Sequence, residues 1–365
     1  MKRLILLLVC VVSVFSVAAQ EMKDVTFQFT EASDLTLVGK VFPQTPNPYQ
    51  RMDFTKYGGW DEKDIHLLEM STGIIVSFKT DSPIITVKPE YSFITGGGAS
   101  GFATRGFDLY IKKNGQWLWA GVACSGTDVE KENGTNRLLV NYMDDSMKEC
   151  ILYLPTYSKE TSVKIGTREG SRIEAGDAPF RHRICIHGSS FMHGASTTRA
   201  GLTVPGYLTR MTGMQFCSLG VSGDCRMQPQ FANALKDADV DAFVFDSFSN
   251  GSAATVEQNL FKFIETIQSS KPGVPMIFMS TIWRENRNFN SIKDRDEQAK
   301  YEMAEKLMAQ AVKKYKDVYF IHSDATSDMH DTTVDGTHPG DYGYYLWAAS
   351  VCKKITRILR KYGIK

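Results

Sequence analysis

The second half of the chain alternates short apolar runs with helical patterns, and this alternation restricts the possible folds more than any other feature. Five runs have the length of strands, at 183–186, 215–219, 242–246, 276–280 and 318–322. Helical spacing of apolar residues recurs between and after them, at 204–211, 228–234, 256–269, 294–315 and 343–362. Alternating strands and helices predict a parallel sheet with helices on both faces.

Chemically useful residues follow the predicted strands. Ligands of such sheets bind at the carboxyl ends of the strands. Ser190 follows the first strand, Gly223 the second and Asn250 the third, while Asp335 and His338 stand three residues apart before the last helix. A serine, a histidine and an acid are the groups that turn a weak hydroxyl into a nucleophile.

The first half has a different pattern. Short runs with β-branched and aromatic residues lie between turn signals, at 35–38, 73–78, 84–87, 107–111, 117–119, 137–140 and 150–154. Many short strands at this spacing predict a β-sandwich, jelly-roll-like in character. A turn-rich linker at 170–179 separates the halves. We therefore predict a β-sandwich domain over 21–178 and an α/β domain over 180–365.

The first 19 residues have the pattern of a secretory signal peptide. Lys2 and Arg3 precede an apolar run over 4–17, and small residues end it before Gln20. About 14 apolar residues are too few to span a bilayer, which takes ~20. We expect cleavage, a secreted or periplasmic protein, and no transmembrane segment after cleavage.

Composition excludes several classes of function. The formal net charge is +1, with 42% hydrophobic and 23% charged residues, which fits a globular protein and gives no sign of a nucleic-acid partner. No C-x-x-C motif is present, and a centre built from His330, Asp331 and His338 fits no standard metal-ligand spacing. We expect neither a cofactor nor a metal. Some of the six cysteines that remain after cleavage could pair in an oxidising compartment, and the sequence assigns no disulfide.

These residues together resemble the SGNH (GDSL-type) hydrolases from about residue 183 to the C-terminus. The resemblance implies a flavodoxin-like three-layer α/β domain with Ser190 as nucleophile and Asp335 and His338 as its partners. Gly223 and Asn250 would join the Ser190 backbone N–H in the oxyanion hole. The sequence departs from the pattern in its first block, which reads Gly-Ser-Ser instead of Gly-Asp-Ser, and in its third, where Phe248 and Gly251 replace the usual glycine and aspartate.

A second resemblance covers the first half. The run 106–110, Gly-Phe-Asp-Leu-Tyr, is similar to the GxDLY signature of a β-domain that precedes certain SGNH hydrolases, and 49–51 and 199–201 fit the same subfamily. It implies a serine esterase, often one that removes acetyl groups from carbohydrate. The expected partner is then an acetylated oligo- or polysaccharide.

Several alternatives stay open on the sequence alone. Ser190 could be a turn residue, Asn250 a cap for the helix that follows, and Asp335 a partner of local backbone only. The function could instead be that of a lipase or thioesterase, or of a non-catalytic glycan-binding protein. Four aromatic residues of the first half are candidates for stacking on sugars or for ordinary packing: Tyr49, Trp60, Trp117 and Trp119.

Overall fold

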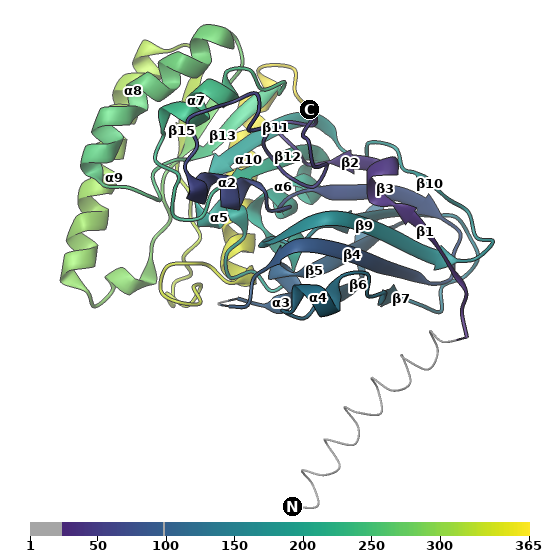
Figure 1. The fold of residues 1–365 in the computed structure, drawn as a ribbon. Coiled ribbons are helices and arrows are strands. Elements are labelled where there is room, and N and C mark those ends of the chain that lie inside the picture. The colour runs from purple at the N-terminus through teal and green to yellow at the C-terminus, as the bar shows by residue number, and fades with distance from the viewer. Residues whose placement is uncertain (1–23, 98) are drawn as a thin grey trace, which may run out of the picture.

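The computed structural model describes residues 24–97 and 99–365, so the predicted signal peptide lies outside the described residues. The β-rich first half and the α/β second half lie side by side, and helices α8 (Ala253–Ser270) and α9 (Ser291–Lys314) are farthest from the antiparallel strands (Figure 1). Within the described ranges, no helix combines the length and apolar character needed to cross a membrane.

A five-stranded parallel sheet of order β12-β11-β13-β14-β15 forms the centre of the second half. Each strand contains or overlaps one of the predicted runs: β11 (Arg181–Gly188), β12 (Met214–Gly220), β13 (Ala242–Asp246), β14 (Met276–Met279) and β15 (Val318–Ile321). Every pairing between neighbours is parallel. The predicted α/β fold class is confirmed.

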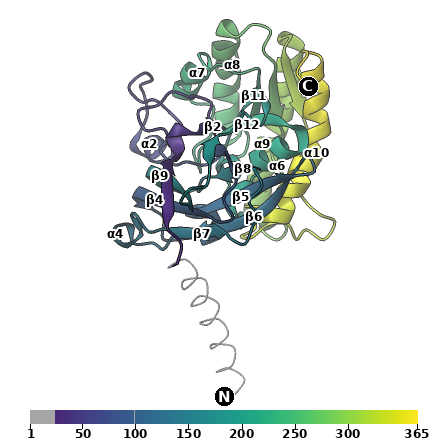
Figure 2. The same ribbon diagram turned by 90° about the vertical axis from the view of Figure 1, so that its right-hand side faces the viewer.

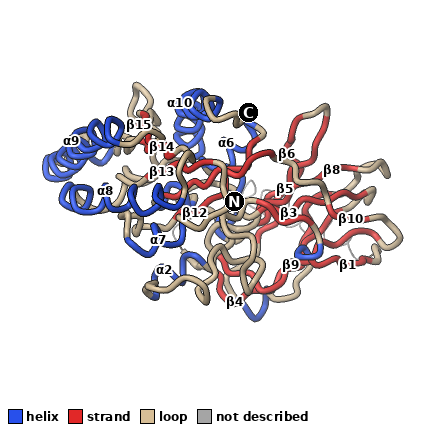
Figure 3. Tube along the Cα trace, turned by 90° about the horizontal axis from the view of Figure 1, so that it is seen from above, coloured by secondary structure: helices blue, strands red, loops and turns tan. Residues whose placement is uncertain are grey.

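Helices cover both faces of this sheet. Helices α6 (Val204–Thr212) and α10 (Asp341–Arg360) lie on one face, with α7 (Pro229–Leu235), α8 and α9 on the other (Figure 3). Along β11, Ile184 and Ile186 join the core on the α6 side, while Cys185 joins the core on the α8 side. Both faces of the strand are buried, which explains its continuous apolar sequence.

The first half contains two antiparallel sheets. One has the order β1-β9-β4-β7, and the other runs β10-β3-β8-β5-β6 with β2 paired to β3. Their strands are β1 (Phe27–Glu31), β2 (Thr36–Val38), β3 (Ile75–Thr80), β4 (Ile85–Ile94), β5 (Gly106–Lys113), β6 (Gln116–Cys124), β7 (Arg137–Val140), β8 (Lys148–Tyr153), β9 (Ser158–Arg168) and β10 (Ile173–Ala175). A shared core holds the two sheets together, with Val76 and Phe78 from one sheet and Val87 and Ile165 from the other.

Short helices complete the chain. They are η1 (Ala32–Asp34), α2 (Glu62–Leu68), α3 (Gly101–Thr104), α4 (Val129–Glu132), α5 (Ser190–His193), η2 (Ala200–Leu202) and η3 (Glu285–Arg287). Of these, α2 begins at an N-cap, Asp61, whose carboxylate accepts a hydrogen bond from the Asp64 N–H. Such a cap satisfies one of the free N–H groups at a helix start.

The segment from residue 41 to residue 70 packs against the second half, which the sequence did not indicate. Phe42, Met52 and Leu68 share one buried core with Phe231 of α7 and Phe263 of α8. In Figures 1 and 2, α2 accordingly lies with the α/β half and away from the far ends of the antiparallel strands. The first half therefore reaches the edge of the sheet at which a site is expected.

The residues of the GxDLY resemblance join the two halves. Asp108 of β5 is buried; its Oδ1 lies 2.7 Å from Arg199 Nη1, and its Oδ2 accepts a hydrogen bond of 3.0 Å from the Gly201 N–H. A Cβ at Gly201 would lie 2.9 Å from that oxygen, so only glycine fits there. Buried Arg51 donates from Nη1 to the Gly220 carbonyl at 2.9 Å, at the end of β12.

Candidate active site

Ser190 lies on a tight turn at the carboxyl end of β11. It is the first residue of α5, and Ser189 before it is the N-cap whose hydroxyl accepts a hydrogen bond from the Phe191 N–H. A Cβ at Gly188 would lie 2.5 Å from Met192 Cγ and 2.8 Å from Asp246 Cβ, which explains the glycine. The turn is tightly packed, and Ser190 is 7% exposed.

A buried carboxylate that sequence reasoning missed holds this turn. Asp246 ends β13, and its Oδ2 accepts hydrogen bonds from the Ser189 N–H at 3.1 Å and the Ser189 hydroxyl at 2.7 Å. Its Oδ1 accepts from the Ser249 hydroxyl. Burial raises the pKa of Asp246, although these hydrogen bonds oppose the shift. Where the family carries aspartate before the nucleophile, this chain has Ser189 and places a carboxylate beside it from the next strand.

The structure brings Ser190, His338 and Asp335 into one hydrogen-bonded chain. Ser190 Oγ lies 2.9 Å from His338 Nε2, and His338 Nδ1 lies 2.7 Å from Asp335 Oδ2. Asp335 Oδ1 also accepts from the backbone N–H groups of Thr337 and His338. Partial burial raises the pKa of Asp335, but the hydrogen bonds from His338 and Thr337 outweigh it, and the net shift is downward. Asp335 thus bonds to local backbone and to the imidazole together.

Glu285 of η3 fixes the loop that carries this pair. Its two carboxylate oxygens accept hydrogen bonds from the N–H and hydroxyl groups of both Thr332 and Thr333. A backbone hydrogen bond from Val334 N–H to the His338 carbonyl, at 2.8 Å, closes the loop on itself. Glu285 is a second functional carboxylate that no local pattern in the sequence marked.

Gly223 and Asn250 lie on two loops that are tied to each other and to the nucleophile turn. Gly223 has φ +70°, a backbone conformation that favours glycine. The Val221 N–H donates to the Gly188 carbonyl at 2.8 Å, and the Cys225 N–H donates to Asn250 Oδ1 at 3.1 Å. The second contact fixes the orientation of the Asn250 side-chain amide and occupies its oxygen. The cap of α8 is Ser252, so Asn250 is not a capping residue.

The departures from the family pattern around Asn250 have structural reasons. Phe248 is buried and packs against Phe278 and Phe320, so a large side chain fills core space where relatives have glycine. The Ser249 carbonyl accepts from Arg284 and from Lys300, and Glu297 lies 2.9 Å and 2.8 Å from those two cations. This buried ionic group anchors the loop in place of the missing aspartate.

A cavity of about 310 Å³ opens beside His338 and Asp335, and both halves of the chain line it. The second half contributes Ala195 and Ser196, and the first half contributes small and polar residues: Thr95, Gly97, Ala99, Thr104 and Tyr157. The Tyr157 hydroxyl lies 2.6 Å from Ser222 Oγ, next to Gly223, and its ring stacks on His193 at 4.2 Å. The β-domain therefore forms one wall of the site.

Other sequence candidates have structural roles. Tyr49 is buried and Trp60 packs edge-on against Phe231, so both are packing residues. Trp119 is 52% exposed, with the Arg199 guanidinium 5.0 Å from its ring. The six cysteines in the described part of the chain are free thiols.

Comparisons with known proteins identify a family for each half of the chain. Residues 181–356 match the GDSL-like lipase/acylhydrolase family, and residues 27–173 match the GxDLY family, the N-terminal part of SGNH-hydrolase-type esterases. No curated protein sequence matches the chain.

Solved structures extend the comparison to nearly the whole length. A protein described as a GDSL-like lipase from Bacteroides ovatus is 34% identical, with a TM-score of 0.87 over 92% of this chain and 98% of its own. A salicylyl-acyltransferase from a tetracycline biosynthetic pathway is 19% identical, with a TM-score of 0.72 over 91% of this chain and 97% of its own. A family two carbohydrate esterase from Cellvibrio japonicus shares the fold at 10% identity and a TM-score of 0.58, over 92% of this chain and 98% of its own. The chain belongs to the GDSL-like lipase/acylhydrolase (SGNH) family, within its GxDLY-containing branch, and is a carboxylic ester hydrolase.

Proposed function

We propose that this protein is a serine esterase that removes small acyl groups, above all O-acetyl groups, from carbohydrates. The observation that carries the proposal is the hydrogen-bonded chain from Ser190 through His338 to Asp335 at the edge of a small cavity.

His338 Nε2 would take the proton of Ser190 Oγ as the oxygen attacks the ester carbonyl, and would return it to the leaving alcohol. Asp335 would keep the Nδ1 proton on the far side of the ring and stabilise the imidazolium that forms. A water molecule, activated by the same imidazole, would then release acetate from Ser190. The first proton transfer uses the Ser190–His338 and His338–Asp335 contacts that the folded chain already makes.

The negative charge of the tetrahedral intermediate needs hydrogen-bond donors. We assign three: the backbone N–H groups of Ser190 and Gly223, and the side-chain amide of Asn250. Ser190 begins α5, where N–H groups have no partner within the helix. The Cys225 N–H occupies Asn250 Oδ1, which leaves the amide nitrogen of Asn250 as the group available to donate.

The cavity supports a small acyl group and a polar substrate. Its volume of about 310 Å³ is at the low end for ligand sites, and its walls carry threonine, glycine, alanine and serine. A lipase would need an apolar channel for a long acyl chain. One fold neighbour, a family two carbohydrate esterase from Clostridium thermocellum at 11% identity and a TM-score of 0.58, was solved in complex with cellohexaose.

Export from the cytoplasm is the second part of the proposal. The first 19 residues have the charged start, apolar centre and small-residue end of a cleaved signal. Acetylated polysaccharides lie outside the cell, so a secreted or periplasmic location fits the proposed substrate. Signal cleavage would be checked by sequencing the N-terminus of the protein recovered from the host's periplasm and medium.

The test of function is acetate release from a panel of acetylated glycans by the mature protein, beside its Ser190→Ala variant. We expect release by the wild type from at least one glycan and near-complete loss in the variant. A parallel series of nitrophenyl esters should show activity falling steeply beyond acetyl and propionyl. Equal release by both proteins would remove Ser190 from the mechanism, and a preference for long acyl chains would favour a lipase.

A further inference from the structure

Three aspartates that the esterase chemistry does not use lie together beside the Gly223 loop. Asp61 and Asp64 are the N-cap and the third residue of α2, and Asp224 directly follows Gly223. One carboxylate oxygen from each lies within 4.8 Å of those of the other two. We propose that this group is a binding site for a hard divalent cation, calcium in particular, which joins α2 to the Gly223 loop.

Asp64 supplies the observation that separates this group from an ordinary surface cluster. Its side chain is fully buried, and its Oδ2 accepts one hydrogen bond, from Gln230 Nε2 at 3.1 Å. Its Oδ1 is buried with no hydrogen-bond donor. A buried carboxylate oxygen without a donor is costly, so such atoms normally have a proton, a donor or a metal beside them.

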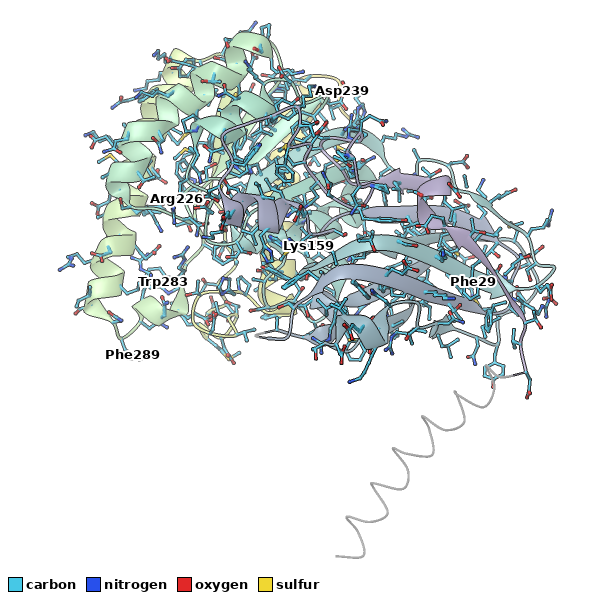
Figure 4. All side chains as sticks on the ribbon, viewed as in Figure 1. Phe29, Lys159, Arg226, Asp239, Trp283 and Phe289 are labelled. Carbon is cyan, nitrogen blue, oxygen red and sulfur yellow. The ribbon has the colours of Figure 1, made fainter. Side chains whose placement is uncertain are left out.

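The positive groups nearby do not compensate the three carboxylates. Arg226 Nη1 lies 2.9 Å from Asp224 Oδ1, and Figure 4 labels Arg226 beside α2. Lys63 donates to the Gly223 carbonyl, 3.3 Å away. Arg226 pairs with one of the three carboxylates and Lys63 with backbone, which leaves the group with excess negative charge.

The donor set selects the type of cation. Carboxylate oxygens without nitrogen or sulfur ligands suit calcium, magnesium or manganese and not zinc or copper. Calcium binds oxygens at about 2.3–2.6 Å, so two oxygens on opposite sides of one ion are about 4.6–5.2 Å apart. The three oxygens all lie within 4.8 Å of one another, so one calcium ion can contact all three, with water completing its coordination. Magnesium loses its water reluctantly and is usually held by only one or two carboxylates, so a group of three carboxylates favours calcium.

The position of the site indicates what a bound cation would do. Asp61 and Asp64 belong to the segment that packs on the α/β half, while Asp224 is one residue from a proposed oxyanion donor. A cation there would hold the two segments together and restrict the motion of the Gly223 backbone. Its direct effect would be on stability, and this effect does not depend on which ester the enzyme hydrolyses.

The test is calcium titration of the metal-free mature protein by calorimetry, with thermal unfolding measured in the same samples. We expect saturable one-site binding with a Kd on the order of 10⁻⁴–10⁻³ M, the range of weakly held calcium modules, and a higher melting temperature with calcium. The variants Asp61→Asn and Asp64→Asn should each weaken binding about tenfold or more and lose the thermal shift.

Controls keep the result interpretable. Asn remains a good N-cap, so Asp61→Asn preserves the start of α2 and should fold normally. Glu62→Gln removes an exposed charge from the same helix outside the group and should bind calcium as the wild type does. No saturable binding up to about 5 mM calcium would overturn the proposal, as would unchanged binding in both aspartate variants. The former outcome would indicate that Asp64 and Asp224 share a proton instead.

Discussion

The two loops that meet in the Ser190–His338 contact are supported in opposite ways. The nucleophile turn lies in the core: Ser190 is 7% exposed, Ser189 is fully buried, and Asp246 beneath them is fully buried as well. The histidine loop lies at the surface, where the side chains of His338 and Asp335 are 25% and 52% exposed. One partner of the proposed reaction is therefore fixed in the core, by packing and by Asp246, and the other at the surface, by hydrogen bonds to Glu285 and within its own loop.

This difference indicates that the nucleophile turn must be rigid, whereas the histidine loop can tolerate changes without loss of the fold. Each loop depends on a carboxylate outside the proposed triad, Asp246 for the turn and Glu285 for the histidine loop. Changes at the buried support should cost stability, whereas changes at the exposed loop should cost activity and leave the fold largely intact. The predictions that follow test this division, beginning with the largest effect.

The largest effect is expected at Asp335. Asp335→Asn should lower kcat by a factor on the order of 10³–10⁴, because the amide no longer holds the imidazole in the required tautomer. The free energy of unfolding should change little, since the side chain is more than half exposed. Steady-state kinetics and urea unfolding on one preparation check both parts. A loss of stability as large as that of a core variant would contradict the expected difference between the buried turn and the exposed loop.

A smaller effect on catalysis is expected at Asn250. Asn250→Ala should lower kcat by about 10²–10³ with KM nearly unchanged, since the amide would act only on the oxyanion. The variant also leaves the Cys225 N–H without its acceptor, so Asn250→Asp, which keeps that acceptor and loses the donor, is the matched control. Both variants should show the kcat loss in the steady-state rates. A normal kcat in Asn250→Asp would remove Asn250 from the oxyanion hole.

At Asp246 we expect a loss of stability. Asp246→Ala should cost about 1–3 kcal/mol or more, because buried donors of Ser189 and Ser249 lose their acceptor. Urea unfolding curves with unchanged slope would measure this loss. A variant as stable as the wild type would show that packing alone holds the turn.

The pH dependence of stability at Asp246 has a definite sign. Its folded pKa is raised by burial above the unfolded value of about 3.9, so its contribution is present below that pH and lost as pH rises through the folded pKa. The wild type should therefore be more stable relative to Asp246→Asn at pH 4 than at pH 7. Urea unfolding of both proteins at the two values measures the difference, and a gap that widens toward pH 7 would reverse the assignment.

The smallest effect is expected at Glu285. Glu285→Gln keeps one oxygen for one of the two threonines and should lower kcat about tenfold or less, with KM and stability close to normal. The loop would hold the imidazole less firmly while the core stays intact. Kinetics beside Glu62→Gln, an exposed change far from the loop, gives the reference. A loss as large as that of Asp335→Asn would mean that Glu285 acts on the reaction itself.

The sequence predicted the α/β half well because its signals are local. Runs such as 242–246 are apolar throughout, since both faces of each central strand are buried, and the helices between them have clear periodicity. Ser190, Gly223 and Asn250 were proposed because they follow those strands, and Asp335 and His338 because they stand three residues apart before the last helix. For these residues to come together, the loops that carry them had only to meet at one edge of the sheet.

Features that depend on long-range contacts were missed. The longest strand, β9, reads Ser-Lys-Glu-Thr-Ser-Val-Lys-Ile-Gly-Thr-Arg, and buried Ser158 and Glu160 conceal its pattern because they hydrogen-bond inside the protein. Asp246 and Glu285 carry no local motif, and their roles come entirely from partners on other elements. The three aspartates beside Gly223 were equally invisible, because Asp224 joins the other two only after folding.

The role of Ser190 as nucleophile is best tested by covalent labelling with a fluorophosphonate, followed by mass spectrometry of the intact protein and its peptides. We predict one adduct per chain, on Ser190, because among the residues that the structure describes its hydroxyl is the one hydrogen-bonded to His338. Ser196→Ala, a change to the serine that lines the cavity beside His338, should label like the wild type, and Ser190→Ala should stay unlabelled. An adduct on a different residue, or equal labelling of Ser190→Ala, would contradict the account.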